Sequence, residues 1–400
     1  MTVTVRCITL LQKATVCVAF LFLLLWIPTS GAGQEQPLTE HFFKGLWVIR
    51  NNLEDSTAID RAIDFAAANG FRQVLMQVRG RGYAFYNSEI VPKSTLVKDP
   101  DFDPLAYAVK KAHSAGLAIH AWINTYLLWS ASSKPSDTTH LIFQHPEWTE
   151  ADSRGVMDMD KDWKRYGNGK WGGIYLSPTH PKVNPYLLNV IQELVDNYDI
   201  DGIHLDYIRY QGVIYGYNPT GRQVFKNRFG VDPLALSTLT EVQPDVWDDR
   251  SYQIYLDVWN TYRRDKITDL IKEAKEICAQ KGIQLSAAVK PDVNNARTRY
   301  FQDWGNWLKD GIIDFVVPMN YASDMDMFLE NFTRMQDENI PISKVYMGIA
   351  VYNQSKYDVA EKILKTLAAH YPGFCLFSYD TFAENPSEIE VLRRFITLSE

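Results

Sequence analysis

The sequence predicts a single (β/α)8 barrel, and three observations support this fold class. Eight short runs that are nearly all apolar recur along the chain, a helical stretch follows each, and no linker rich in proline, glycine and serine divides the chain. Parallel strands covered on both faces have this apolar character, and eight strand–helix repeats close a barrel. The alternative, a doubly wound sheet, would need fewer strands or a second domain.

The apolar runs are the expected strands of the barrel. Each is rich in β-branched, aliphatic and aromatic residues and is too short for a typical helix. They comprise residues 45–50, 73–78, 117–123, 202–208, 283–289, 313–319, 345–351 and 374–379. We expect each strand to point its carboxyl end toward one mouth of the barrel.

The helices are expected from their caps and their periodicity. Ser56 can cap the first helix and Gly70 can end it, while Pro104 begins the second and Gly116 ends it. The later helices are expected at residues 186–197, 250–281, 298–310, 324–338, 356–370 and 386–399. Two connections are unusually long, residues 124–178 and 209–249, and loops of this length are usually functional.

The first 33 residues resemble a targeting segment. Arg6 and Lys13 precede an apolar run at residues 14–27, which ends in proline and small residues. This order is typical of a secretory signal cleaved near residue 33, so we expect a secreted or periplasmic protein with its barrel domain at residues 38–400. The alternative is an uncleaved membrane anchor, which would be the protein's only expected contact with a membrane.

Composition excludes several classes of function. The formal net charge is −7 without long runs of one sign, which argues against nucleic acid as the partner. Beyond residue 33 only Cys278 and Cys375 remain, so no disulfide framework is expected. The 8 histidines are scattered without ligand spacing, and the sequence predicts neither a metal site nor a cofactor.

Polar residues at the ends of the expected strands define a candidate site. The segment "DIDGIHLDYIRY" (199–210) ends a strand at Asp206, which we expect to be an ionised nucleophile or base. Asp292, Asp324 and Glu89, in this order, are the candidates for its acid partner. The expected substrate-binding residues are Arg79, Glu89, Trp122, Asn124, His204, Arg209, Lys290, Asn320, Tyr321 and Asp380.

Some of these residues also have a structural interpretation. Asp206 could hold Arg209 or Lys290 at the rim, because structural ion pairs are common. His204 lies two positions before Asp206 on the same strand face, which favours a hydrogen-bonding role beneath the site. Asp199 and Asp201 precede the strand and are expected at the opposite end of the barrel, in a turn.

The two long loops are expected to form the walls of a cleft. Trp163, Trp171 and Tyr217 are candidates for stacking on sugar rings. The alternative is that these aromatic residues form the small core that a long loop needs.

Residues 176–211, "LSPTHPKVNPYLLNVIQELVDNYDIDGIHLDYIRYQ", resemble the signature region of the glycosyl-hydrolase-like family ten. The segment "QVRGRGYAFYNSEIVPKS" (77–94), "GLWVIR" and "AWINTY" resemble the same family's first three strands. The resemblance implies a secreted (β/α)8 glycoside hydrolase of bacterial polysaccharides, including peptidoglycan glycan strands, with Asp206 central to its site. Gln211, Gly80 and Asn87 stand where the family usually has proline.

The motif "DGIHLDYI" is also similar to the strand-four motif of the family eighteen chitinases. Their proton donor is a glutamate at the end of that motif, where this chain has Ile208, and their middle aspartate is His204 here. The loss of the acid excludes their substrate-assisted mechanism with these residues. The leading hypothesis is therefore a hydrolase of a bacterial cell-wall glycan or exopolysaccharide that uses a carboxylate pair, and the alternative is a non-catalytic carbohydrate-binding barrel.

Overall fold

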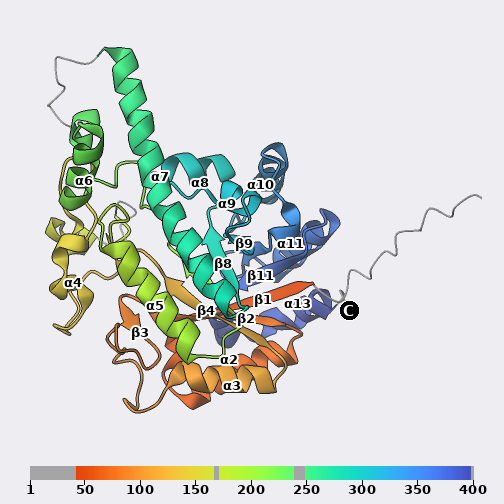
Figure 1. The fold of residues 1–400 in the computed structure, drawn as a ribbon. Helices are drawn as coiled ribbons and strands as arrows, with labels where there is room; N and C mark the ends of the chain where they lie inside the picture. Colours follow the sequence, from red (N-terminus) through yellow and green to blue (C-terminus); the bar gives the residue numbers. More distant parts are fainter. Residues whose placement is uncertain (1–41, 166–170, 238–247, 398–400) are drawn as a thin grey trace, which may run out of the picture. The chain divides into compact units, whose positions relative to one another are not determined.

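The structure, a computed structural model, describes residues 42–165, 171–237 and 248–397 (Figure 1). The proposed signal, residues 1–33, lies outside the described residues, so its assignment stays a prediction. The described chain from Phe42 onward is one compact unit.

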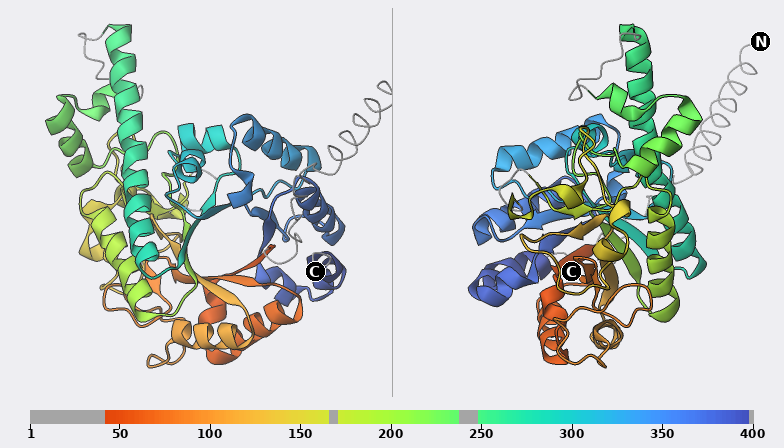
Figure 2. Two further views of the ribbon diagram at one scale, coloured as in Figure 1. Left: turned by 45° about the vertical axis from the view of Figure 1, so that its right-hand side comes forward. Right: turned by 90° about the vertical axis from the view of Figure 1, so that its left-hand side faces the viewer.

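Within the described residues, eight parallel strands form a barrel whose order around the ring follows the order in sequence. They are β1 (Phe43–Val48), β2 (Gln73–Gly80), β4 (Ala118–Asn124), β7 (Gly202–Asp206), β8 (Gln284–Val289), β9 (Phe315–Pro318), β10 (Met347–Ala350) and β11 (Gly373–Phe377). Single bridges between β9 and the β10 region, Val316 to Val345 and Met319 to Gly348, close the ring. Figure 2 (left) looks along this ring, and the predicted fold class is confirmed.

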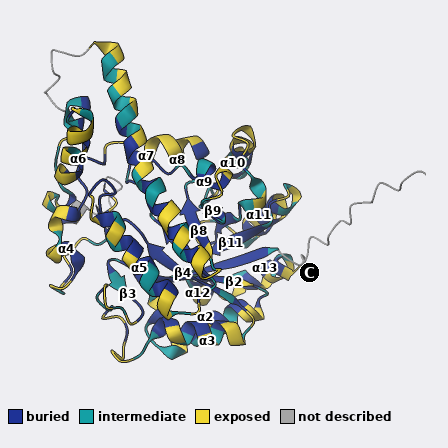
Figure 3. Cartoon of the chain, viewed as in Figure 1, coloured by how far each residue is buried: buried dark blue, intermediate teal, exposed yellow. Residues whose placement is uncertain are grey.

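Helices surround the strands, which are almost wholly buried (Figure 3). They are α2 (Ser56–Ala68), α3 (Pro104–Ser114), α5 (Val183–Asn197), α7 (Asp249–Gln280), α8 (Val293–Arg299), α9 (Trp304–Lys309), α10 (Met325–Asp337), α11 (Lys356–Ala368), α12 (Tyr379–Glu384) and α13 (Ser387–Thr397). The single helix expected at residues 298–310 is instead two helices, α8 and α9. The backbone of Phe301 between them has φ 55°, which a continuous helix does not allow.

Asp201, directly before β7, has a structural role. Asp201 accepts hydrogen bonds from the backbone N–H of Ile119 (2.7 Å) and from Nε2 of His113 (3.0 Å). The next residue must be glycine, because a Cβ atom on Gly202 would lie 2.3 Å from Nδ1 of His120. Asp201 thus ties β7 to β4 at the amino end of the barrel, away from the mouth.

The two long connections carry elements of their own. The first, residues 124–178, contains a two-stranded sheet of β5 (Leu127–Trp129) and β6 (Ile174–Tyr175) and the helix α4 (Leu141–Gln144). The short strand β3 (Tyr83–Ala84) lies in the earlier connection after β2 and pairs with that strand. The second contains α6 (Pro219–Phe229), which packs with the first half of α7 where this helix projects past the barrel (Figure 1). The apolar cluster between α6 and the first half of α7 is centred on Tyr217, Phe225, Trp259 and Tyr262.

Candidate active site

A cavity of about 240 Å³ opens at the carboxyl ends of the strands. Aromatic side chains make up much of its wall, and a row of polar groups crosses it. The residues that line it are Trp47, Ile49, Arg50, Gln77, Trp122, Asn124, Leu127, Ser130, Asp206, Tyr207, Ala288, Met319, Tyr321 and Phe377. Active sites of (β/α)8 enzymes lie at this face, which makes the cavity the candidate active site.

Asp206 ends β7 at the wall of the cavity and is only 7% exposed. Its Oδ1 accepts a hydrogen bond of 2.6 Å from the backbone N–H of Tyr207. Tyr207 has φ 50°, in the left-handed region that a non-glycine residue rarely adopts. Such strain is concentrated at functional sites, where it holds a neighbouring group in place.

Burial raises the pKa of Asp206 above that of a free aspartate. The charges of Arg209 and Lys290 and the N–H of Tyr207 favour the anion, but their combined effect is smaller than that of burial. The Trp122 indole also favours the anion, although its Nε1 makes no hydrogen bond of regular geometry. The sequence predicts an ionised Asp206 with Arg209 or Lys290 nearby; the structure places both cations beside it, and its ionisation stays a prediction.

His204 lies beneath Asp206 in the barrel interior and is fully buried. Its Nε2 accepts a hydrogen bond of 3.2 Å from Nε1 of Trp47, so its proton is on Nδ1, which donates to Oγ of Ser286 at 2.9 Å. Burial lowers the pKa of His204 well below its usual value, and the ring is neutral. The expectation that His204 binds substrate is therefore corrected, since both ring nitrogens are engaged and the residue does not line the cavity.

The polar row in the cavity comes from β2, β4 and the turn that follows β1. Nη1 of Arg50 donates to Oε1 of Gln77 (3.0 Å), and Nε2 of Gln77 donates to Oδ1 of Asn124 (3.0 Å). Asn124 stands opposite Asp206 in the pairing of β4 with β7. Sequence reasoning missed Gln77, although a polar residue within the apolar run "QVLMQV" was a signal that could have found it.

Arg79 does not reach the cavity. The pairing of β2 with β4 contains a bulge between Gln77 and Arg79, so Gln77 aligns with Trp122 and Arg79 with Ile123. Because one extra residue reverses the side-chain alternation of a strand, Gln77 faces inward and Arg79 faces outward. Arg79 is fully buried there and donates to the backbone carbonyls of Asn124 and Thr125.

Asn320 and Tyr321 were both expected at the mouth, but adjacent residues of an extended chain point to opposite sides. Tyr321 lines the cavity. Asn320 faces α10, where its Nδ2 donates to the carbonyl of Phe328 (3.0 Å) and its Oδ1 accepts from Asn331 (2.9 Å).

The two first candidates for the acid partner are helix caps. Asp292 accepts from the backbone N–H of Asn295 (2.9 Å) at the start of α8 and pairs with Arg334. Asp324 accepts from the N–H of Met327 (2.9 Å) at the start of α10. Aspartate is favoured at this position because it satisfies a free N–H of the first turn. Neither residue lines the cavity.

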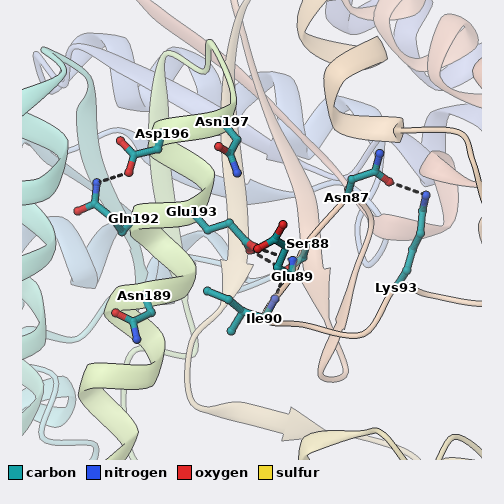
Figure 4. A pocket seen from close by; sticks show the side chains of 10 residues that line it. All are labelled: Asn87, Ser88, Glu89, Ile90, Lys93, Asn189, Gln192, Glu193, Asp196 and Asn197. Atoms are coloured by element: carbon teal, nitrogen blue, oxygen red, sulfur yellow. Dashed lines mark hydrogen bonds between the residues drawn. The ribbon is translucent and has the colours of Figure 1, made fainter.

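Glu89 and Asp380 also lie elsewhere. Glu89 lines a separate, open cavity of about 690 Å³ between the loop after β3 and α5, where its backbone N–H donates to Oε1 of Glu193 at 2.7 Å (Figure 4). Asp380 is bound by Nδ2 of Asn52 (2.9 Å) and Oγ of Ser378 (3.2 Å). Among the described residues, Asp206 is thus the one carboxyl group that lines the cavity at the mouth.

Arg209 and Lys290 lie beside the cavity, and both act electrostatically on Asp206. The guanidinium of Arg209 lies 4.8 Å from the centre of the Tyr207 ring, which itself lines the cavity. Of the expected binding residues, Trp122, Asn124 and Tyr321 line the cavity, and Arg209 and Lys290 adjoin it.

The aromatic residues expected to stack on sugars are buried. Trp163 and Trp171 are each 8% exposed and belong to the main core, and Nε1 of Trp171 donates to Asp158 (3.3 Å). Tyr217 is 4% exposed and its ring lies 5.7 Å from that of Trp259. These side chains therefore pack inside the fold, Trp163 and Trp171 in the main core and Tyr217 in the cluster formed with α6 and α7.

Two buried carboxyl groups in the first long loop were also missed. Glu150 accepts hydrogen bonds from the N–H of Ala151 (3.0 Å) and Oγ of Ser177 (3.1 Å), and burial raises its pKa to about 8. Burial likewise raises the pKa of Asp158 to about 6, although Lys161 lies 2.8 Å away. Neither lines the cavity; they hold the loop.

Across residues 42–165, 171–237 and 248–397, no three histidine, cysteine, aspartate or glutamate side chains are placed to bind a metal ion together. In the same residues, no helix is both long and apolar enough to cross a membrane.

The fold matches that of solved (β/α)8 glycoside hydrolases. The structure is similar to the glycoside hydrolase domain of PgaB (BpsB) from Bordetella bronchiseptica, with a TM-score of 0.63 and 12% identity over 89% of this chain and 99% of that one. It is also similar to the catalytic domain of a β-amylase from Paenibacillus polymyxa, with a TM-score of 0.58 and 13% identity over 90% of this chain and 99% of that one. At these identities the likeness concerns the fold.

Residues 43–363 match the family described as Glycosyl hydrolase-like 10, and the chain belongs to this family. Glycosyl hydrolase YngK of Bacillus subtilis is 25% identical over 73% of this chain and 55% of its own length. Glycosyl hydrolase DigH of Escherichia coli O6:H1 is 24% identical over 82% of this chain and 70% of its own length. The chain therefore spans only about half of YngK. The resemblance stated from strand four is confirmed.

Proposed function

We propose that this protein hydrolyses glycosidic bonds in a bacterial cell-wall glycan or exopolysaccharide, and that Asp206 protonates the leaving oxygen. The observation that carries the proposal is a buried carboxyl group with a raised pKa in the wall of an aromatic-lined cavity at the mouth of the barrel. A general acid must hold its proton near the working pH, and burial is the usual way to achieve this.

The aromatic wall and the polar row would bind the sugar. The rings of Trp122, Tyr207 and Tyr321 offer apolar faces to a pyranose, and the amides of Gln77 and Asn124 offer donors and acceptors to its hydroxyl groups. Because Gln77 and Asn124 are hydrogen-bonded to each other, they are held in place before a substrate arrives.

A second candidate function, a non-catalytic carbohydrate-binding barrel, is favoured by one observation. Glycosidases of the two usual types use two carboxyl groups, and among the described residues only Asp206 lines the cavity. The residues expected to supply the second carboxyl group, Asp292, Asp324 and Glu89, have other positions in the fold.

One experiment separates these two functions. Protein without residues 1–33 is incubated with peptidoglycan, de-peptidylated glycan strands, chitin oligomers and β-1,6-linked glucosamine polymers, and new reducing ends are measured. The hydrolase proposal requires reducing ends from at least one polymer that disappear in Asp206→Asn. Binding of a polymer without any product would establish the binding barrel instead.

We further propose that residues 1–33 direct export and are then removed, on the basis of their basic start, apolar run and small-residue end. The mass of the protein recovered from the periplasm or the medium of an expressing bacterium tests this proposal. We expect the mature chain to begin near Gln34. Recovery of the full-length chain in the membrane fraction would show an uncleaved anchor.

A further inference from the structure

Three cations surround one aromatic ring next to the candidate active site. Cζ of Arg209, Nζ of Lys290 and Cζ of Arg299 lie 5.5, 5.1 and 5.5 Å from the centre of the Tyr300 ring. Tyr300 follows α8 directly. We call Arg209, Lys290 and Arg299 the cationic cluster.

The cationic cluster has an excess of positive charge. Within the described residues, none of its three members forms an ion pair with a carboxylate. Arg209 is only 9% exposed, and its Nε is buried without a hydrogen-bond partner. A buried guanidinium N–H without an acceptor is costly, so this position favours a ligand that brings a hydrogen-bond acceptor and negative charge.

The carboxyl group of Asp206 does not neutralise this charge. One carboxyl group stands against three cations, of which it acts on Arg209 and Lys290, and burial raises its pKa. Lys290 shows the crowding of like charges. Burial lowers its pKa, and the positive charge of Arg209 lowers it further, to about 8. A bound anion would relieve this repulsion.

Hydrogen bonds to the backbone fix the cluster. The N–H of Lys290 donates to Oε1 of Gln302 (2.8 Å), and the carbonyl of Lys290 accepts from Nε1 of Trp304 (3.0 Å). Nε2 of the fully buried Gln302 also donates to the carbonyl of Ile208 (3.4 Å), the residue before Arg209. Gln302 thus joins the segment that carries Lys290 to the segment that carries Arg209, and binding would require little reorganisation.

We propose that the cationic cluster binds a carboxylate of the glycan, so that the substrate is an anionic polysaccharide with an acidic sugar next to the cleaved bond. This inference rests on the proposed function, because Arg209 and Lys290 adjoin Asp206 and an anion held there belongs to the same ligand as the bond. The planar guanidinium of Arg209 matches a carboxylate, and the ammonium of Lys290 adds a point charge. The carboxylate can come from a uronic acid or from a lactyl ether on the sugar.

Binding of matched polymers tests the inference. Asp206→Asn protein is titrated with de-peptidylated glycan strands, which carry lactyl carboxylates, and with a uronic acid polymer, each beside the same polymer after reduction of its carboxyl groups to alcohols. We expect at least one carboxylated polymer to bind about tenfold or more tightly than its reduced form, since charge-assisted hydrogen bonds are lost on reduction. Which polymer discriminates identifies the source of the carboxylate.

Two variants and a control locate the effect. Lys290→Met and Arg209→Gln are each added to Asp206→Asn, and each should lose most of the preference for the carboxylated polymer over its reduced form. If the protein with Arg209→Gln does not fold, the result with Lys290→Met decides the test. Arg297→Gln is the matched control, because Arg297 lies on α8 outside the cluster and lies 3.7 Å from Asp303. Arg297→Gln should keep the preference for the carboxylated polymer.

Equal binding of the carboxylated and reduced forms, or no binding of either carboxylated polymer, would overturn the inference. The proposed function is judged separately, by cleavage with the wild-type protein. If the binding preference holds but no reducing ends appear, only the hydrolase proposal fails.

Discussion

At the scale of single residues, burial raises the pKa of the carboxyl groups inside the fold. Glu150 has a pKa of about 8 in the folded protein against 4.5 when free, so the folded state binds its proton more tightly than the unfolded state does. The resulting stabilisation is fully present below pH 4.5 and is lost as the pH rises through 8.

The expected result is a free energy of unfolding that decreases between pH 5 and pH 9 by up to several kcal/mol on account of Glu150. In Glu150→Gln this contribution is absent, so the decrease should be smaller. Urea unfolding of both proteins at pH 6 and pH 9 measures it. Equal pH dependence in the two proteins would show that Glu150 is ionised in the fold.

At the scale of helices and strands, Asp292 and Asp324, which the sequence predicts to be catalytic, are the N-caps of α8 and α10. Asp324→Ala should cost about 1 kcal/mol of stability, the usual effect of losing an N-cap, and should change turnover of a glycan no more than a few-fold. Thermal unfolding and a reducing-end assay check the two effects. A fall in turnover of orders of magnitude without loss of stability would return Asp324 to the list of catalytic candidates.

The cluster formed by α6 and the first half of α7 makes a contrasting prediction. Tyr217 is 4% exposed and packs on Trp259, so Tyr217→Ala should cost about 3 kcal/mol, as deletion of a buried aromatic ring does. The control Val213→Ala, at a site that is 52% exposed, should change stability by less than about 0.5 kcal/mol. Unchanged stability of Tyr217→Ala would favour the sugar-stacking role expected from the sequence.

For the whole molecule, the strand count and strand order could be predicted because each strand is one short apolar run and the barrel repeats this pattern. The site was harder to predict, because a shift of one residue along a strand decides whether a side chain faces the cavity or the surrounding helices. The bulge after Gln77 turns the side chain of Arg79 away from the mouth of the barrel. Asn320 and Tyr321 are adjacent and point to opposite sides, so only Tyr321 of the two faces the cavity. Neither is visible in residue types alone.

The domain boundary is a prediction at the same scale. The described fold begins at Phe42, so removing residues 1–33 should leave a soluble protein that unfolds in one cooperative transition. Calorimetry with matched circular dichroism would measure this. Aggregation of the truncated protein would contradict the assignment of residues 1–33 as a segment outside the fold.

The central claim, that Asp206 is the acid of a glycan hydrolase, is tested most directly by the turnover of Asp206→Asn on whichever polymer the wild-type protein cleaves. Asparagine keeps the shape of the neutral carboxyl group but has no proton to give, so we expect turnover to fall about 100- to 10,000-fold. The melting temperature and the affinity for the polymer should stay nearly unchanged, because asparagine has nearly the size and shape of aspartate and burial penalises the charged form of the carboxyl group. Full activity of Asp206→Asn would contradict the claim, and the buried carboxyl group at the end of β7 would then be structural.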